Sequence, residues 1–288
     1  MKRPRQPPTS PPSMTAPGAG RPGRERDHSA PHRASPLSGS YKTATARLRA
    51  TPELTLIWGF HAAQEALRSE SRKILRVSAT EAAAERLAPE LEARGITPEI
   101  FTGADLDAKM PRDAVHQGVV VEARPLADLD ISDVPDTGTL LVLDQITDPH
   151  NVGAIMRTAA AFDVAAMITT ERHAPDMTGV LAKSASGGLE HVPVVHVVNL
   201  ARALDSLAKR GFQIVGLDSE GTQPLEHVEP SSSLVLVLGA EGKGLRRLTR
   251  ERCEVVARLD MPGAIKSLNV SNACAVALAT LRLRRPAS

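Results

Sequence analysis

The sequence predicts an α/β protein with a mostly parallel β-sheet, and two observations carry this prediction. Over residues 138–286, short and continuously apolar runs alternate with longer segments of helical periodicity. The apolar runs lack the strict polar–apolar alternation of a half-exposed sheet, so helices should cover both faces. Because ligands of such sheets bind beyond the carboxyl ends of the strands, the loops that follow the strands should carry the function.

Residues 54–124 predict a smaller α/β unit that precedes this sheet. Apolar residues at helical spacing predict helices over residues 60–68, 81–94 and 105–109. Short apolar runs predict strands over residues 74–77, 98–101 and 118–123. Residues 125–137 are acidic and contain Pro125 and Pro135, so we expect a linker to the next unit there.

Residues 138–286 predict the larger unit, in which strands and helices alternate. Its strands are expected over residues 139–145, 165–169, 192–197, 213–217, 233–239 and 255–259. Its helices are expected over residues 152–162, 180–187, 200–209, 245–252 and 268–283. We find no internal repeat in the sequence.

The composition excludes several classes of protein. The chain has 288 residues, of which 42% are hydrophobic and 24% are charged, as in ordinary globular proteins. No apolar run approaches the ~18 residues that a membrane helix needs. The two cysteines, Cys253 and Cys274, are too few for a disulfide scaffold or a thiolate metal cage, and we expect them to be core thiols. Aromatic residues, at 2%, are too few for a base-stacking platform.

The net charge of +2 hides an uneven distribution along the chain. Residues 1–50 hold ten Lys or Arg residues, two acidic residues and nine prolines, which leaves +8 there and −6 on the other 238 residues. Such a segment cannot bury enough apolar surface to fold, so residues 1–53 are predicted to be a disordered basic tail. It could tether a polyanion or be an ordinary solvated tail. A transit peptide is disfavoured, because the prolines interrupt any long amphipathic helix.

The loop after the strand over residues 139–145 carries unusual polar residues. Asn151 stands where a helix N-cap is expected, and that role alone could explain an asparagine. Arg157 lies six residues later in an Ala-rich, otherwise apolar helix, so it needs an anionic partner or an exit to solvent. A functional role and an exposed position on the helix are both open for Arg157.

Two further loops follow strands near the C-terminus. Residues 239–244 form a glycine-rich turn that contains Glu241 and matches neither the P-loop nor the G-x-G-x-x-G spacing. The start of the last helix carries four polar residues where one would suffice as a cap: Ser267, Asn269, Ser271 and Asn272. Three apolar residues would supply a wall for a ligand beside them: Leu259, Met261 and Leu268. The run of Arg246, Arg247 and Arg250 is expected on a solvated helix face, although a phosphate could meet it.

Three stretches in these loops stand out together: LDQITDPHNVGAIMRTAAAFDV from residue 143, LVLGAEGKGL from residue 236 and MPGAIKSLNVSNACAVAL from residue 261. In this order and at strand ends, they resemble motifs one, two and three of the SpoU/TrmH family of RNA 2′-O-ribose methyltransferases. WGFHAAQEA from residue 58 and HQGVVVEA from residue 116 resemble the start and the end of the family's small substrate-binding domain. With that domain present, the chain is most similar to members that methylate a guanosine in 23S rRNA.

The resemblance implies an L30e-like α/β substrate-binding domain at residues 54–124, followed by a SPOUT α/β-knot catalytic domain at residues 138–286 with a C-terminal trefoil knot. It also implies a cytoplasmic homodimer that binds RNA and S-adenosylmethionine and uses neither a metal nor a membrane. The implied cofactor contacts are Gly216, Gly239, Leu259, Met261 and Leu268. The implied catalytic set is Asn151, Arg157, Glu241, Ser267 and Asn269.

The reaction that the resemblance implies is methyl transfer to a ribose 2′-hydroxyl. This hydroxyl is a poor nucleophile, so it needs a base or a cation beside the forming alkoxide. A guanidinium resists deprotonation, so Arg157 suits charge stabilisation better than base catalysis, alone or with an RNA phosphate. Asn151 and Asn269 would orient Arg157, the substrate or the cofactor, and Glu241 would anchor that network.

Other functions stay open at this point. Within the family, the substrate could be a tRNA or an adenosine. The chain could also be a non-catalytic RNA-binding factor in ribosome assembly, although a pure binder has no need of the implied catalytic set. A nicotinamide or nucleotide enzyme is disfavoured, because the glycine fingerprint of those enzymes is missing.

Overall fold

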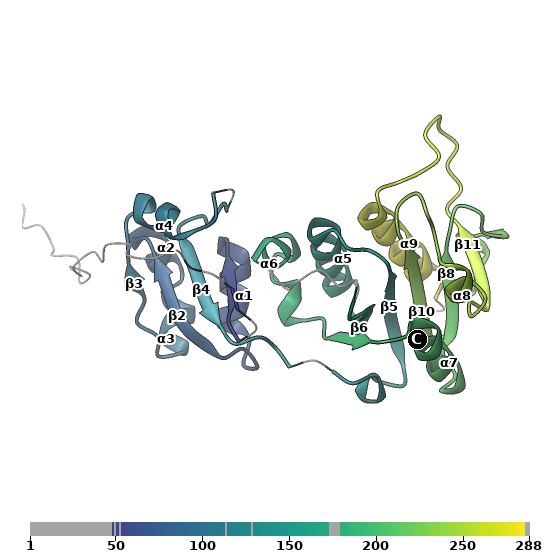
Figure 1. Ribbon diagram of the computed structural model, residues 1–288, viewed down its shortest axis with the longest axis horizontal. Coiled ribbons are helices and arrows are strands. Elements are labelled where there is room, and N and C mark those ends of the chain that lie inside the picture. The colour runs from purple at the N-terminus through teal and green to yellow at the C-terminus, as the bar shows by residue number, and fades with distance from the viewer. Residues whose placement is uncertain are drawn as a thin grey trace, which may run out of the picture. The chain divides into compact units, whose positions relative to one another are not determined.

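The strands of the protein form two sheets in the computed structural model (Figure 1). The structure describes residues 48, 50–51, 53–112, 114–127, 129–172 and 179–285. The predicted basic tail, residues 1–53, therefore lies almost wholly outside the described residues. Among the helices that are described, none is both long and apolar enough to cross a membrane.

The first sheet has four strands in the order β1-β4-β2-β3. Strands β1 and β2 pair antiparallel with β4, and β3 pairs parallel with β2. Its elements are β1 (Thr55–Trp58), α1 (Phe60–Arg68), β2 (Ile74–Ala79), α2 (Glu81–Arg86), α3 (Ala88–Ala93), β3 (Glu99–Ile100), α4 (Gly103–Lys109) and β4 (Val119–Ala123).

Two features of the first sheet differ from the predictions. The single helix predicted over residues 81–94 is wrong, because the chain leaves helical geometry at Leu87 and restarts as α3 with Pro89 in its first turn. A proline is tolerated there because the first amides of a helix need no partner within it. Strand β1 was not predicted, because its four residues pass directly into α1 and pair only with β4, more than 60 residues away.

The second sheet has seven strands in the order β7-β6-β5-β10-β8-β11-β9, and every neighbouring pair is parallel. Its strands are β5 (Gly138–Asp144), β6 (Val164–Thr170), β7 (Val194–Val197), β8 (Gln213–Leu217), β9 (Gln223–Pro224), β10 (Ser233–Gly239) and β11 (Val255–Arg258). Its helices are α5 (Pro149–Ala161), α6 (Gly179–Ala185), α7 (Leu200–Lys209), α8 (Arg247–Arg250) and α9 (Val270–Arg284), with short 3-10 turns η1 (Ile131–Asp133), η2 (Gly188–Glu190) and η3 (Leu225–His227). The predicted parallel α/β architecture is confirmed.

Helices cover both faces of the second sheet, as the continuously apolar strands predict. Leu141 and Leu143 of β5 pack in one buried cluster with residues of α5, α6 and α9. Leu140 and Val142 of the same strand point the opposite way, into a cluster with the apolar side of α7. Successive side chains of a strand alternate between faces, so each apolar run serves two cores.

Several predicted boundaries in the second sheet are wrong. The helix predicted over residues 245–252 shrinks to α8, because the amides of Leu245 and Arg246 donate to the carboxylates of Asp218 and Asp144 instead of entering a helix. The strand predicted from residue 192 begins at Val194 in β7. The two-residue strand β9 was not predicted.

Helix α5 begins three residues earlier than predicted, and Asn151 is not its N-cap. Asp148 caps the helix by accepting a hydrogen bond from the amide of His150, and Pro149 occupies the first turn. A proline at the first helical position is itself a start signal. Asn151 therefore lies inside the helix, which leaves its side chain available for another role.

The first sheet packs against helix α6 through a very close approach. A Cβ atom on Gly179 would lie 1.5 Å from the ring of Trp58, so only glycine fits at that position. Arg72 and Glu190 form an ion pair of 2.7 Å in which both side chains are 2% exposed. The trefoil knot implied by the resemblance stays a prediction, because strand order and neighbours alone do not define a knot.

Candidate active site

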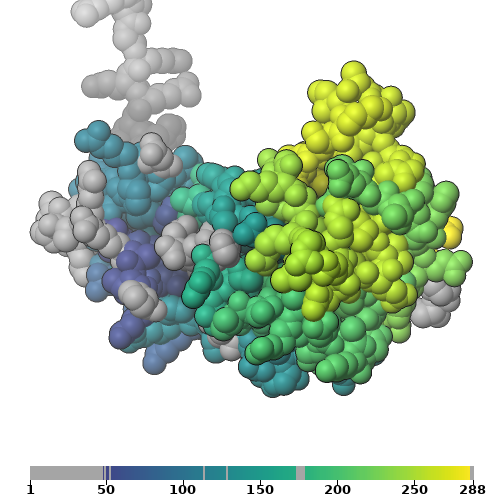
Figure 2. All heavy atoms as spheres, turned by 45° about the vertical axis from the view of Figure 1, so that its right-hand side comes forward, coloured from purple at the N-terminus to yellow at the C-terminus, as the bar shows by residue number. Residues whose placement is uncertain are grey.

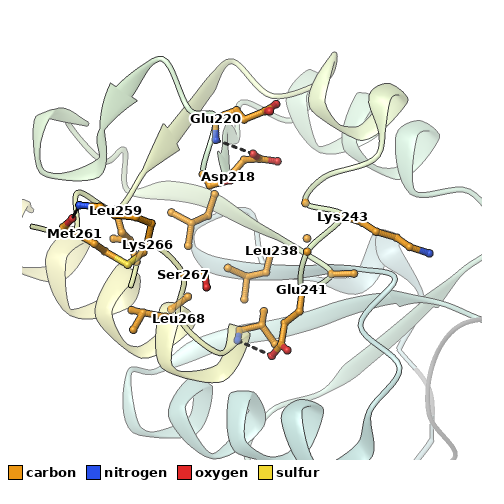
Figure 3. Close-up of a pocket in the computed structure, with 18 of the residues that line it drawn as sticks. Asp218, Glu220, Leu238, Glu241, Lys243, Leu259, Met261, Lys266, Ser267 and Leu268 are labelled. Carbon is orange, nitrogen blue, oxygen red and sulfur yellow. Dashed lines mark hydrogen bonds between the residues drawn. The ribbon is translucent and has the colours of Figure 1, made fainter. Parts of the chain in front are cut away.

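A cavity of about 310 Å³, here called the cofactor pocket, opens at the carboxyl ends of β8, β10 and β11 (Figure 3). This is the edge at which ligands bind to open parallel sheets. The long loop between β11 and α9 forms one wall and projects from the surface (Figure 2). The lining residues are Leu217 to Glu220, Leu238 to Gly244, Arg250, Leu259, Met261, Lys266 to Leu268, Val270 and Ala273.

The pocket combines an apolar wall with a close turn of backbone. Leu238, Leu259 and Leu268 supply aliphatic surface. A Cβ atom on Gly239 would lie 2.3 Å from the backbone of Gly244, so the turn can close this tightly only with glycine. Gly244 has φ +62°, a conformation that side-chain-bearing residues rarely adopt. The turn thereby exposes backbone groups to a ligand at close range.

Asp218 is the buried carboxylate of this pocket. It accepts hydrogen bonds from the amides of Leu245 and Glu220, each 3.0 Å long, and pairs with Arg250 at 2.7 Å. Burial alone would raise the pKa of Asp218, but the two amides and the guanidinium outweigh it and hold the pKa below its usual range. Asp218 is therefore ionised at neutral pH and joins the β8 loop to the turn after β10.

Three predicted catalytic residues form one hydrogen-bonded cluster beside the pocket, here called the Asn–Glu–Asn cluster. The Glu241 carboxylate accepts from Asn269 Nδ2 at 2.9 Å, from Asn151 Nδ2 at 3.3 Å and from the amide of Val270 at 3.1 Å. Asn269 Nδ2 also donates to Asn151 Oδ1 at 2.9 Å. The three side chains come from α5, from the turn after β10 and from the start of α9. The structure thus brings three loops together that the sequence places up to 118 residues apart.

Asn269 has a second task at the start of the last helix. Its side-chain oxygen accepts from the amide and the hydroxyl of Ser271, which caps α9. One of the four polar residues therefore suffices as the cap, as predicted. Ser267 lies in the wall of the cofactor pocket and outside the Asn–Glu–Asn cluster.

Arg157 lies apart from the Asn–Glu–Asn cluster. It lies six positions after Asn151 in α5, which is about 9 Å along the axis and about 120° around the helix. Its side chain is exposed and forms no hydrogen bond or ion pair with other residues that the structure describes. It lines a separate hollow with His61, Gly187 and His191. Of the two options left open by the sequence, an exit to solvent is what the structure shows for Arg157.

Four of the five predicted cofactor contacts line the cofactor pocket: Gly239, Leu259, Met261 and Leu268. Gly216 does not line it, because it lies inside β8, where a Cβ atom would meet Leu245 and Cys253 at less than 3 Å. Six polar lining residues were not predicted as site residues: Asp218, Ser219, Glu220, Lys243, Arg250 and Lys266. Among them, Lys266 donates from its ammonium to the carbonyl of Met261 at 2.6 Å. A polar residue directly after a buried strand was the available signal for Asp218.

The two cysteines take no part in this site as nucleophiles. Burial raises the pKa of Cys274 to about 12, and its side chain is fully buried. Burial also raises the pKa of the half-buried Cys253 to about 12, against the opposing charge of Arg250. Both are therefore thiols at neutral pH, and neither can act as a thiolate there.

The arrangement suits transfer of a group between a bound cofactor and an outer substrate. The pocket offers an apolar wall and backbone groups, and the Asn–Glu–Asn cluster at its rim can position a hydroxyl through neutral hydrogen bonds. Among the described residues, no group of three His, Cys, Asp or Glu side chains could hold a metal ion.

Comparisons with known proteins agree with this geometry. A family model described as "SpoU rRNA Methylase family" matches residues 138–279, and one described as "RNA 2'-O ribose methyltransferase substrate binding" matches residues 56–129. The 23S rRNA (guanosine-2′-O-)-methyltransferase RlmB of Vibrio vulnificus is 38% identical over 232 residues, which cover 77% of this chain and 94% of the relative.

Two solved structures share the fold. The SpoU methyltransferase AviRb from Streptomyces viridochromogenes, in complex with the cofactor AdoMet, superposes with a TM-score of 0.68 at 24% identity, over 81% of this chain and 91% of AviRb. An RNA 2′-O ribose methyltransferase superposes with a TM-score of 0.70 at 20% identity, over 81% of this chain and 89% of the other. At these identities the likeness shows a common architecture of both sheets.

Proposed function

Because the chain belongs to the SpoU rRNA methylase family, we propose that it methylates the ribose 2′-hydroxyl of a guanosine in 23S rRNA, with S-adenosylmethionine as the methyl donor. The observation that carries this proposal is the Asn–Glu–Asn cluster at the rim of the cofactor pocket, assembled from all three motifs. The relatives at 38% identity over most of the chain support the substrate.

The residues of the cofactor pocket fit S-adenosylmethionine. A cavity of about 310 Å³ suits a nucleoside of that size, and Leu238, Leu259 and Leu268 offer a wall for the adenine. The turn from Gly239, which a Cβ atom would fill, brings backbone groups close to the ligand. The carboxylate of Glu241, which pairs with no Lys or Arg among the described residues, favours a cationic ligand. When bound, S-adenosylmethionine supplies an electrophilic methyl group on a sulfonium.

The chain's own residues then orient the substrate and disperse its charge. Glu241 holds the amides of Asn151 and Asn269 in fixed directions, so that their remaining polar atoms can bind the ribose. Ser267, in the pocket wall, would bind the same ribose or the cofactor. Arg157 would stabilise the forming alkoxide, because a guanidinium is a cation and this one has no other partner among the described residues.

We further propose that the protein acts as a homodimer, in which Arg157 serves the site of the other subunit. Within one chain, Arg157 lies apart from the Asn–Glu–Asn cluster. Helix α9 exposes two large apolar residues, Val276 at 44% and Leu283 at 86%, and it shares a buried cluster with α5. Exposed apolar residues of this kind suit a covered surface. A second copy on this face would cover it and bring a second Arg157 to the same region.

The remaining assignments follow from the same premise. We propose residues 54–124 as the RNA-binding domain and residues 138–286 as the catalytic domain, since the two family models match residues 56–129 and 138–279. We propose the cytoplasm as the location, because that is where bacterial 23S rRNA is found.

The test is labelled methyl transfer from S-adenosylmethionine to unmodified transcripts of 23S rRNA and of tRNA. We expect label in 23S rRNA, in a guanosine whose 3′ phosphodiester resists alkali, because alkaline cleavage needs a free 2′-hydroxyl. Label in tRNA alone, or in an adenosine, would assign the chain to another substrate. Binding of rRNA without transfer to either RNA would favour the assembly factor.

A further inference from the structure

A second cavity, here called the arginine pocket, lies at the same edge of the seven-stranded sheet and has about 500 Å³ of volume. It follows β6 and β7, whereas the cofactor pocket follows β8, β10 and β11. Its lining residues are Thr170, Arg172, Val198 to Ala201 and Arg246 to Thr249. None of these residues belongs to the cofactor pocket or to the Asn–Glu–Asn cluster.

Among the residues that the structure describes, every charged residue that lines the arginine pocket is basic. These residues are Arg172, Arg246 and Arg247. Arg172 is exposed and forms no hydrogen bond or ion pair with the residues that the structure describes. Arg247 pairs only with Glu251 on its own helix, an exposed contact that holds it weakly. Arg172 can therefore meet an anion directly, and Arg247 can do so by exchanging its exposed partner.

Arg246 is held in a fixed direction. Its Nε donates to Asp144 at 2.6 Å, and its backbone amide donates to the other oxygen of the same carboxylate at 3.0 Å. Asp144 is completely buried at the end of β5, so the carboxylate that holds the Arg246 side chain is itself fixed in position. The terminal nitrogens of Arg246 form no hydrogen bond with other described residues, and its side chain is 41% exposed. A guanidinium oriented in this way can grip a phosphate through two parallel hydrogen bonds.

The pocket also exposes apolar surface. Val198 is 80% exposed and Leu248 is 48% exposed, although both are large apolar residues. Asn199 caps α7 by accepting a hydrogen bond from the amide of Arg202, and Asn199, Leu200 and Ala201 place the start of that helix in the pocket wall. Positive charge beside an aliphatic surface suits a nucleotide, whose phosphate meets arginine and whose base covers the apolar residues.

The position of the pocket limits which nucleotide it could hold. In the strand order β6-β5-β10, two strand spacings of about 4.8 Å separate β6 from β10, so the nearest strands of the two pockets lie about 10 Å apart along one edge. Resting on the proposed function, we propose that the arginine pocket binds a nucleotide of the substrate RNA that neighbours the methylated one, by its phosphate and by one face of its base. It thereby positions the target ribose at the rim of the cofactor pocket.

The experiment compares charge-removing variants of the full chain on a transcript of 23S rRNA. In Arg172→Gln/Arg247→Gln we expect KM for RNA to rise about tenfold, with kcat changed far less, because two charge-assisted contacts are lost. The plot of the logarithm of the RNA-binding constant against the logarithm of the salt concentration should become less steep by about 1.4, because each contacted phosphate of a single strand contributes about 0.7 to the slope. Binding of S-adenosylmethionine should stay as in the wild type. Arg246 is left intact, because its loss would strand the buried Asp144.

Lys209→Gln is the matched control. Lys209 is exposed at the other end of α7, and its substitution removes a charge of the same sign. If the double variant changes KM and the salt slope no more than twice as much as this control, the proposal is overturned. Val198→Ser alters the apolar surface without changing charge, and we expect a severalfold rise in KM. An unchanged KM in Val198→Ser would overturn the base contact.

Failure of the proposed function is distinguishable from failure of this inference. If the wild type transfers no methyl group, filter binding can still compare the affinity of the double variant and of the control for the same transcript. Weaker binding in the double variant alone would support the arginine pocket as an RNA site, and equal binding would remove it.

Discussion

The two pockets at the carboxyl edge of the seven-stranded sheet recognise charge in different ways. In the cofactor pocket, Arg250 pairs with Asp218, Lys266 donates to a carbonyl and Lys243 points away from the other labelled side chains (Figure 3). In the arginine pocket, Arg172 has no partner among the described residues, and Arg247 has only the exposed Glu251. The first pocket thus binds two of its cations through its own groups, whereas the second leaves arginines open to an anion.

Asp144 shows how one sheet can carry both environments. Its carboxylate ends β5, between the strands of the two pockets, and it accepts both the amide and the side chain of Arg246. The chain that leaves the cofactor turn is therefore fixed at the point where it enters the arginine pocket. From this we expect that substitutions can separate cofactor binding from RNA binding.

The largest effect is expected from Arg157→Ala, which should impair methyl transfer while leaving both pockets intact. Transfer should fall ~100–1000-fold, the usual scale for losing a charge stabiliser at the reacting oxygen. Binding of S-adenosylmethionine, measured by calorimetry, should match the wild type. An active Arg157→Ala enzyme would show that Arg157 has no role in methyl transfer.

Mixing two inactive variants sharpens the assignment of Arg157. If it serves the other subunit, Arg157→Ala mixed with Asn269→Ala should regain activity, because one site of each mixed dimer then holds both wild-type residues. At equal mixing, this restores about a quarter of the sites in a twofold-symmetric dimer. No recovery, with exchange of subunits verified by mass spectrometry, would place Arg157 in its own subunit's site.

The next effect is expected from Gly239→Ala in the cofactor turn. The added Cβ would lie 2.3 Å from the backbone of Gly244, so the turn must open. We expect a ~10–100-fold weaker affinity for S-adenosylmethionine, as calorimetry would measure, with RNA binding unchanged. Gly263→Ala is the matched control, because a Cβ atom on Gly263 would have no neighbour within 4 Å. Equal affinities in the two variants would contradict the role given to the turn.

A smaller effect is expected from deleting residues 1–50. The segment carries +8, so its loss should weaken RNA binding severalfold and lower the salt slope if it contacts phosphates. Filter binding across a salt series measures both quantities. An unchanged slope would assign RNA affinity to the folded part, including the arginine pocket.

The smallest effect on activity is expected from Asp218→Asn, which acts on stability. The folded-state pKa of Asp218 is lowered, so its ionised form stabilises the fold above its unfolded pKa of about 3.9, and this contribution is lost as pH falls through the folded value. At pH 7 the variant should lose roughly 1–3 kcal/mol of unfolding free energy. Urea unfolding should show that the difference in unfolding free energy between the wild type and Asp218→Asn disappears below about pH 4. A difference in unfolding free energy that does not change with pH would mean that the charge of Asp218 does not stabilise the fold.

The parallel sheet was predictable from sequence because its signal is local. Each apolar run of the second sheet is long enough to fill two cores, so strands such as β5 and β10 were recognised almost to the residue. The short β9 and the truncated α8 were not, because tertiary hydrogen bonds decide them. The amides of Leu245 and Arg246 look helical in sequence and are diverted by two carboxylates from other strands.

The candidate site divides in the same way. Glu241 and Asn269 could be named from the motif resemblance, but their mutual hydrogen bond depends on loops that meet only in the folded chain. Asp218 escaped notice because a single aspartate after a strand has many ordinary explanations. Its role becomes visible only with Gly244 and Leu245 packed against it.

The close contact between Trp58 and Gly179 gives the protein a built-in optical probe. Trp58 is the only tryptophan of the chain, and it is 5% exposed against α6. Its emission therefore reports the seam between the first sheet and α6 without any label. A red shift on addition of RNA would reveal that this seam opens during substrate binding, and an unchanged spectrum would show that it stays closed.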